Sequence, residues 1–151
     1  MNHKHLPQEE LLQAWLEMSV FIRGNRFLTD FSFNEIMICG LLFRQQELGG
    51  APLTATELCE YTNLLKSQVN HILTGMENRG WIQRVRSTQD KRVVHVHLLE
   101  SGRASYLKEH GKVMDIIRTV FDALGTAKAQ ELTALMKEAT SAVNTYQKGA
   151  N

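Results

Sequence analysis

Four basic side chains gather within nine positions of this chain, and their type and spacing suit a negatively charged partner. They are Arg84, Arg86, Lys91 and Arg92. Arginine binds phosphate and carboxylate groups through paired hydrogen bonds, and lysine binds them as a point charge. Six basic and two acidic residues lie between Thr62 and Arg92, although the formal net charge of the whole chain is only +1. The positive charge is therefore segregated, and we expect this segment to bind a polyanion.

The basic segment is built from a helix that runs directly into a hairpin. After Gly80 the apolar period changes to two, which predicts strands at Trp81–Arg86 and Arg92–Leu98. The loop between them, Ser87–Arg92, is charged, whereas a hairpin normally needs only turn residues there. Glycine adopts a positive φ without penalty, so Gly80 is a suitable end for the preceding helix.

The helix before the hairpin is predicted from about Lys66 to Gly80. One face carries the apolar residues Val69, Ile72, Leu73 and Met76. The polar residues outside that face lie mostly near the start of the helix, at Lys66, Ser67, Gln68, Asn70, His71 and Thr74. We expect the apolar face to pack on the core and the polar side chains to stay accessible.

Two capping boxes predict the helices that precede this one. Ser32 and Glu35 open a helix that ends near Leu48, and Thr54 and Glu57 open a short helix to about Tyr61. The short helix, the turn Thr62–Asn63 and the next helix form a helix-turn-helix pattern. Outside this central part, apolar faces at helical spacing predict helices at about 8–28, 101–124 and 126–146.

Composition limits the class of protein. A chain of 151 residues with 43% hydrophobic residues is long enough for one globular domain, residues 1–151. The longest apolar run, Ile36–Phe43, is far shorter than the roughly 20 residues of a membrane span, and no signal peptide precedes it. We therefore expect a cytoplasmic protein without membrane contact. Hydrolase, metalloprotease, P-loop and dinucleotide motifs are missing, so we expect neither an enzyme nor a cofactor.

Helix-turn-helix followed by a two-stranded hairpin is the order of a winged helix, in which a recognition helix enters the major groove and the wing reaches the backbone or the minor groove. The stretch "LTATELCEYTNLLKSQVNHILTGMENRGWIQRVRSTQDKRVVHVHLLESGR", Leu53–Arg103, resembles the DNA-binding core of the MarR family of bacterial transcriptional regulators. Asp90-Lys91-Arg92 after Arg84, followed by an alternating strand and Gly102, is similar to the D-x-R wing signature of that family.

The resemblance implies a mainly α fold with a two-stranded β-wing. The winged helix-turn-helix core would span 32–100, flanked by dimerisation helices at 1–31 and 101–147. It also implies a homodimeric repressor that binds pseudo-palindromic double-stranded DNA and is released by a small-molecule effector.

The resemblance also assigns roles to individual residues. Asp90 would brace the wing by pairing with a basic side chain, Arg84 above all. Independently of the resemblance, a wing needs an apolar base packed on the helices, and the strand valines Val85, Val93, Val94 and Val96 would form it. His71 stands where the family often has arginine. The DNA contacts implied are Lys66, Ser67, Gln68, Asn70, His71, Arg84, Arg86, Lys91 and Arg92, with amides suited to adenine edges and serine and lysine to phosphates.

Three alternatives stay open at this level. Cys39 or Cys59 could make the protein a thiol-based redox sensor, although we expect Cys39 to be a small core residue. A winged helix could also serve as a protein-interaction module without DNA, but such a wing would not need this set of basic side chains. His95 and His97 share one strand face, and because two ligands do not make a metal site we expect no metal.

Overall fold

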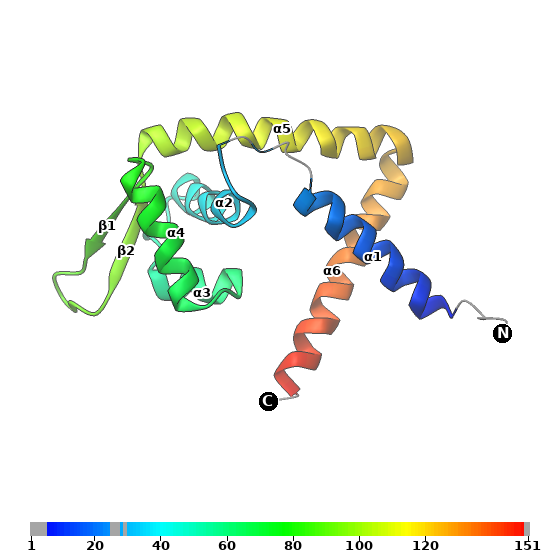
Figure 1. Cartoon of the computed structure of the whole chain (residues 1–151), viewed down its shortest axis with the longest axis horizontal. Helices are drawn as coiled ribbons and strands as arrows, with labels where there is room; N and C mark the ends of the chain where they lie inside the picture. Colours follow the sequence, from blue (N-terminus) through cyan, green and yellow to red (C-terminus); the bar gives the residue numbers. More distant parts are fainter. Residues whose placement is uncertain (1–5, 25–27, 29, 150–151) are drawn as a thin grey trace. The chain divides into compact units, whose positions relative to one another are not determined.

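The computed structural model describes residues 6–24, 28 and 30–149 of the chain (Figure 1). Its two compact units are Met1–His110 and Gly111–Asn151, with the boundary inside one long helix. The helices and strands of the described residues are α1 Pro7–Gly24, α2 Phe33–Glu47, α3 Ala55–Thr62, α4 Lys66–Asn78, β1 Ile82–Arg86, β2 Val94–Leu98, α5 Glu100–Leu124 and α6 Thr126–Gly149. The predicted mainly α fold with a two-stranded wing is confirmed.

Both predicted capping boxes are present and position the first two helices of the core. Ser32 Oγ accepts the Glu35 backbone N–H at 3.3 Å, and the Glu35 carboxylate accepts the Ser32 N–H at 2.7 Å. Thr54 and Glu57 repeat the arrangement at 3.1 and 2.7 Å. The hydrogen bond from the Thr54 backbone, followed by that from its side chain, lowers the pKa of Glu57. Each box satisfies backbone donors that a helix start leaves unpaired.

The core of the first unit lies between α2, α3, α4 and the hairpin. The predicted apolar face of α4 is confirmed, with Val69, Leu73 and Met76 fully buried and Ile72 packed against them. The other buried apolar side chains of this core are Phe31, Ile38, Cys39, Leu42, Leu53, Leu58, Ile82, Val96, Leu98 and Tyr106. Gly80 has φ = 69° and ends the helix as predicted, so the chain turns directly into β1.

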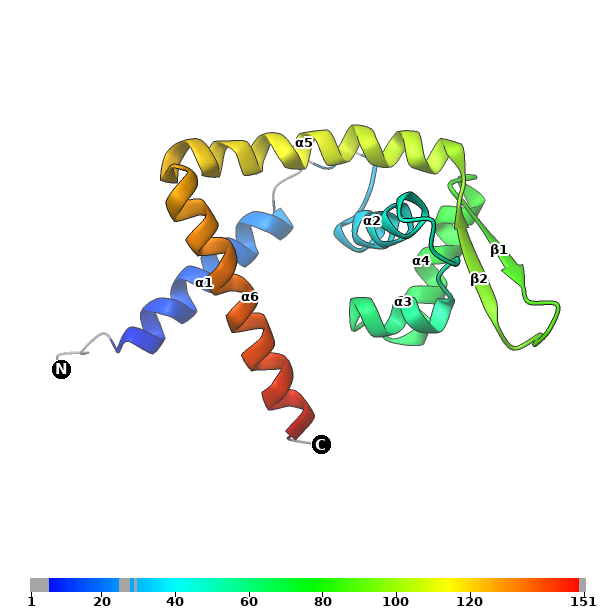
Figure 2. The ribbon, with the colours of Figure 1, turned by 180° about the vertical axis from the view of Figure 1, so that it is seen from behind.

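The hairpin is antiparallel, with a register from Ile82 opposite Leu98 to Arg86 opposite Val94. Its strands begin later than predicted, and the loop between them is 87–93. The hairpin lies beside α4 when seen from either side (Figures 1 and 2). The prediction that Val85 belongs to the apolar base of the wing is wrong, because this side chain is 41% exposed. Alternation places Ile82, Arg84 and Arg86 on the inner face and Val85 on the other.

A third segment joins the sheet at one point that the sequence did not reveal. Thr54 forms an isolated antiparallel bridge with His95, and the Val96 N–H donates to the Leu53 carbonyl at 2.8 Å. A bridge of one residue pair is too short to show the alternation of apolar and polar residues that predicts a strand, so the sequence does not predict it. His95 Nδ1 lies 3.3 Å from the Pro52 carbonyl. Within the described residues, no three His, Cys, Asp or Glu side chains are arranged to hold a metal ion.

The terminal helices carry exposed apolar side chains. The first helix ends at Gly24 rather than Leu28, and residues 25–27 of the prediction lie outside the described residues. No residue of α1 is buried, and Trp15 is 58% exposed. In the second unit, α6 exposes Leu135 and Met136 by 55% and 59%. In the part of the chain that the structure describes, no helix is long and apolar enough to cross a bilayer. The single-domain assignment of residues 1–151 stays a prediction.

Candidate nucleic-acid interface

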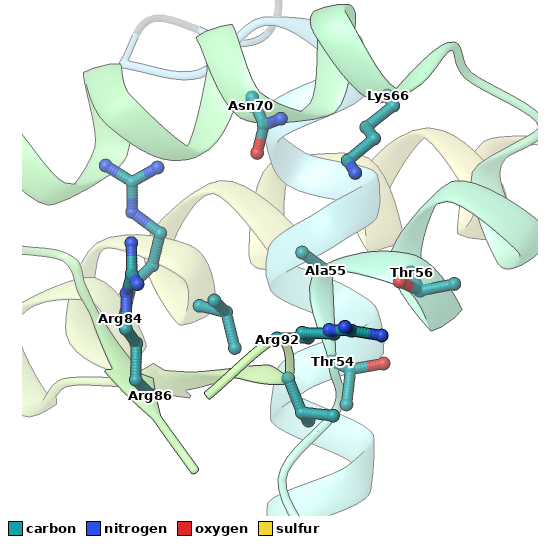
Figure 3. A pocket seen from close by; sticks show the side chains of 10 residues that line it. Thr54, Ala55, Thr56, Lys66, Asn70, Arg84, Arg86 and Arg92 are labelled. Atoms are coloured by element: carbon teal, nitrogen blue, oxygen red, sulfur yellow. The ribbon is translucent and has the colours of Figure 1, made fainter. Parts of the chain in front are cut away.

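A cleft of about 610 Å³ opens between the hairpin and the helices α3 and α4. Five of the nine predicted DNA contacts line it, namely Lys66, Asn70, Arg84, Arg86 and Arg92. Lys66 and Asn70 point into it from α4, and Arg84 reaches from β1 toward α4 (Figure 3). The cleft has no carboxylate among its lining residues, which include Thr54 and Thr56 from the start of α3. It therefore offers cations and hydrogen-bond donors to an anionic ligand.

The other predicted contacts lie on exposed positions next to the cleft. On α4 these are Ser67, Gln68 and His71, and at the hairpin tip it is Lys91. The apolar face of α4 packs on the core, so the opposite face, which carries these polar side chains, is exposed to solvent. The turn between α3 and α4 begins at Asn63, which ends α3 in the left-handed conformation at φ = 55°. Asparagine tolerates this region better than most residues.

The start of α4 has an unusual cap that the sequence analysis missed. The N-cap residue is Leu65, which is 70% exposed and has no side-chain acceptor for the helix donors. Gln68 Oε1 accepts the Leu65 backbone N–H at 2.9 Å, so half of a capping box is formed. This bond occupies the amide oxygen of Gln68 and leaves its NH₂ group for another partner.

Replacing Leu65 with serine is expected to raise the free energy of unfolding by about 1 kcal/mol, because serine completes the box with Gln68. The loss of apolar burial is small at a side chain already 70% exposed. Urea unfolding followed by circular dichroism measures the change. Leu48→Ser is the matched control, since Leu48 is 84% exposed and follows a helix rather than preceding one. Equal stability of Leu65→Ser and the parent chain would contradict the missing-cap interpretation.

The tip of the hairpin is held by hydrogen bonds within its own loop. Ser87 Oγ accepts the backbone N–H groups of Gln89 and Asp90 at 3.2 and 3.3 Å. Asp90 Oδ1 accepts the Arg92 N–H at 2.9 Å, and the Val93 N–H donates to the Asp90 carbonyl at 2.9 Å. The loop thus has a defined shape, and among the described residues the side chains of Arg86, Lys91 and Arg92 form no ion pair.

The predicted pairing of Asp90 with Arg84 is wrong. The Arg84 guanidinium instead binds Glu77 of α4, with Nε and Nη2 donating to Oε2 at 2.9 and 2.6 Å. Hydrogen bonds from the Arg84 side chain and then from its backbone lower the pKa of Glu77. Alternation along β1 turns Arg84 toward α4, whereas Asp90 lies beyond the strand end in its own turn. Glu77 was not among the predicted site residues, and its only signal in the sequence is its place in the last turn of α4.

The two cysteines differ in accessibility. Cys39 is fully buried, as predicted for a core residue, and burial, followed by the charge of Glu35, raises the pKa of its thiol to about 12. Cys59 is half-buried. A thiol that stays protonated near neutral pH is a poor nucleophile and is slow to oxidise.

We therefore expect iodoacetamide to label Cys59 well before Cys39 in the folded protein at pH 7.5. Peptide mass spectrometry over a labelling time course measures the two rates, and the same reaction in denaturant shows that both thiols can react.

Cys39→Ser and Cys59→Ser are expected to bind and release DNA as the parent does. Faster labelling of Cys39, or loss of peroxide-induced release in either variant, would favour the redox-sensor alternative.

Known proteins resemble this chain in sequence. A family model described as the MarR family matches residues 46–93, which include α3, α4, β1 and the wing loop. The "Transcriptional repressor MprA" of Escherichia coli K12 is 22% identical over 144 residues. The alignment covers 93% of this chain and 81% of MprA.

Solved structures resemble it in fold. The PcaV transcriptional regulator of Streptomyces coelicolor, in complex with its natural ligand, has a TM-score of 0.73 at 13% identity, covering 95% of this chain and 97% of PcaV. The Staphylococcus aureus MepR–DNA complex has a TM-score of 0.72 at 17% identity, covering 92% of this chain and 99% of MepR. At such identities the structural likeness shows the fold, while the sequence matches point to the family. The family match, the curated relatives and the fold together support a MarR-family winged-helix transcriptional regulator.

Proposed function

We propose that this regulator is a cytoplasmic repressor that binds a pseudo-palindromic operator as a homodimer. The observation that carries the proposal is the cleft between α4 and the wing, where Lys66, Asn70, Arg86 and Arg92 converge without a carboxylate. A recognition helix in the major groove and a wing beside it would place these groups on one stretch of duplex. Phosphate contacts would set the register, and contacts to base edges would select the sequence.

The side chains divide by chemistry into phosphate-binding and base-reading groups. Lys66 and Ser67 suit phosphates at the start of α4, where the helix dipole also favours an anion. Asn70, His71 and the free NH₂ group of Gln68 suit base edges. The wing contributes Arg86, Lys91 and Arg92, and Asp90 gives their loop its shape through the Arg92 N–H. Arg84 differs from these because its guanidinium is engaged by Glu77.

Apolar side chains on α1 and α6 support the homodimer. Leu11 and Trp15 of α1 are 68% and 58% exposed, and Leu135 and Met136 of α6 are 55% and 59% exposed. Large exposed apolar surfaces rimmed by polar residues mark protein interfaces. A two-fold dimer would present two copies of α4 to half-sites about one helical turn, roughly 34–36 Å, apart.

A small-molecule effector would release the operator. This part of the proposal rests on the family resemblance and on relatives such as PcaV, which was solved with its natural ligand. A redox trigger is less well supported, because the thiol of Cys39 is buried and protonated. The effector would act by binding the DNA-free arrangement better than the DNA-bound one.

Selection of bound genomic fragments with the purified protein tests DNA recognition. We expect enrichment of inverted repeats, and at least a thousandfold tighter binding to them than to scrambled sequence at physiological salt. Sedimentation at micromolar concentration is expected to give a dimer. Equal affinity for operator and scrambled duplex would favour the protein-interaction alternative, and a monomer that still binds one half-site would remove the dimer from the proposal.

A further inference from the structure

Glu77 is a carboxylate of α4 beside the candidate interface, and it joins α4 to β1 through Arg84. Its Oε1 accepts the Arg84 backbone N–H at 2.9 Å, and its Oε2 accepts Arg84 Nε and Nη2 at 2.9 and 2.6 Å. Arg84 Nη2 also lies 3.2 Å from Thr74 Oγ1, one helical turn earlier on α4. One side chain of α4 therefore binds both the backbone and the guanidinium of a wing strand.

The backbone bond satisfies a donor that the hairpin itself cannot satisfy. Arg84 is opposite Val96 in the register, and the Val96 N–H donates to Leu53 rather than to β1. Arg84 and Val96 therefore form a non-hydrogen-bonded pair of the antiparallel sheet. In such a pair the backbone N–H of Arg84 points away from β2, toward the open edge of the sheet. Glu77 covers that edge donor, which would otherwise be left to water.

The position of Glu77 is unfavourable for a helix taken alone. It lies in the last turn of α4, where the helix dipole disfavours a negative charge, and that turn has no basic residue. Three hydrogen bonds from Arg84, two of them charge-assisted, offset this cost and lower the pKa of the carboxyl group. The hydrogen bonds of Glu77 to Arg84 of the wing therefore explain why an acidic residue is stable at this end of α4.

The bond also determines which arginines remain for DNA. Arg84 and Arg86 lie two residues apart on the same face of β1, and both line the cleft. The charge of Arg84 is neutralised within the protein, whereas Arg86 and Arg92 form no ion pair among the described residues. The position of β1 against α4 sets the distance from these two arginines to Lys66 and Asn70 across the cleft (Figure 3).

We propose that Glu77 is a positioning residue for DNA binding, which holds the wing against the recognition helix through Arg84. The inference rests on the proposed function, since it concerns how the wing and α4 meet one duplex. It assigns Arg84 an indirect role, through Glu77, in place of a phosphate contact. Electrostatics alone predicts the opposite effect of Glu77, because removing a negative charge beside a polyanion should tighten binding.

The test compares the affinity of selected operator DNA for the parent dimer and for Glu77→Gln over a range of salt concentrations. We expect Glu77→Gln to bind on the order of threefold to tenfold more weakly, because glutamine cannot keep the charge-assisted pair with Arg84. The slope of log affinity against log salt should stay unchanged, since no phosphate contact is lost. Arg92→Ala should instead lower that slope by about one.

Glu60→Gln is the matched control, an exposed acid of α3 for which the described residues provide no ion-pair partner. It should bind as tightly as the parent or slightly more tightly. The double variant Glu77→Arg with Arg84→Glu exchanges the two charges. If the ion pair between α4 and the wing supports DNA binding, this variant should bind operator more tightly than either single variant. Hydrogen exchange of the Arg84 amide reports the same contact without DNA, and Glu77→Gln should accelerate it.

The outcomes separate the two proposals. If the parent fails to prefer operator over scrambled duplex, the proposed function is wrong. If the parent prefers operator but Glu77→Gln binds as tightly as Glu60→Gln, the positioning role is overturned. A lower salt slope for Arg84→Gln, equal to that of Arg92→Ala, would likewise overturn it and return Arg84 to the phosphate contacts.

Discussion

Replacing Gly102 with alanine is expected to lower the free energy of unfolding by about 1–3 kcal/mol, the range for overpacking a close contact. Gly102 is buried in the first turn of α5, against the start of the wing. A Cβ there would lie 2.3 Å from the Trp81 carbonyl oxygen and 2.9 Å from Leu98 Cδ1. That oxygen accepts the Leu99 N–H at 2.9 Å and cannot move without breaking the bond.

Gly111→Ala is the matched control in the same helix, because a Cβ at Gly111 meets nothing within 4 Å. It should stabilise the protein by about 1 kcal/mol, the difference in helix propensity between glycine and alanine. Urea unfolding with an unchanged m-value measures both variants. If Gly102→Ala proved as stable as Gly111→Ala, the close approach of α5 to the Trp81 carbonyl would be contradicted.

Asn70→Ala is expected to weaken operator binding by about 1–3 kcal/mol, or roughly 5- to 150-fold, and to relax the preference at one base pair of each half-site. The side chain is exposed on α4 and points into the cleft (Figure 3). An amide can bind adenine with two hydrogen bonds, and alanine removes both. Binding to non-specific duplex should change little, because no charge is lost.

Asn78→Ala makes the same change at the far end of α4 and serves as the control, since Asn78 is exposed but lies outside the cleft. Affinity measured against operators substituted one base pair at a time identifies the position that Asn70 reads. A uniform loss over all sequences, together with a lower salt slope, would assign Asn70 to the backbone rather than to a base.

Much of the architecture was predictable because the signals that produce it act between residues close in the chain. Ser32 with Glu35 and Thr54 with Glu57 form their caps as expected, and Gly80 ends α4 with a positive φ. Helical periodicity correctly identified Val69, Leu73 and Met76 as core. These features depend on hydrogen bonds and spacings over three or four residues, and a single sequence contains them in full.

The candidate site was predictable in composition but not in its internal contacts. The segregation of basic residues pointed to the segment that forms the cleft, and five predicted side chains line it. The sequence did not predict which of these cations forms an ion pair within the described residues. Arg84, Arg86 and Arg92 have the same charge and similar positions in the sequence, so only their surroundings distinguish the paired one from the others.

The sequence by itself determined the order of the elements, the capped helix starts at Ser32 and Thr54, and the concentration of positive charge in the middle segment. Only the tertiary structure decided that Arg84 binds Glu77 rather than Asp90, that Val85 faces outward, and that Leu53 extends the sheet. Each of these outcomes depends on the distance between groups on different elements. Charge and hydrophobicity along the chain describe what a side chain can bind, whereas the packing of α4 against the hairpin decides which partner comes within reach.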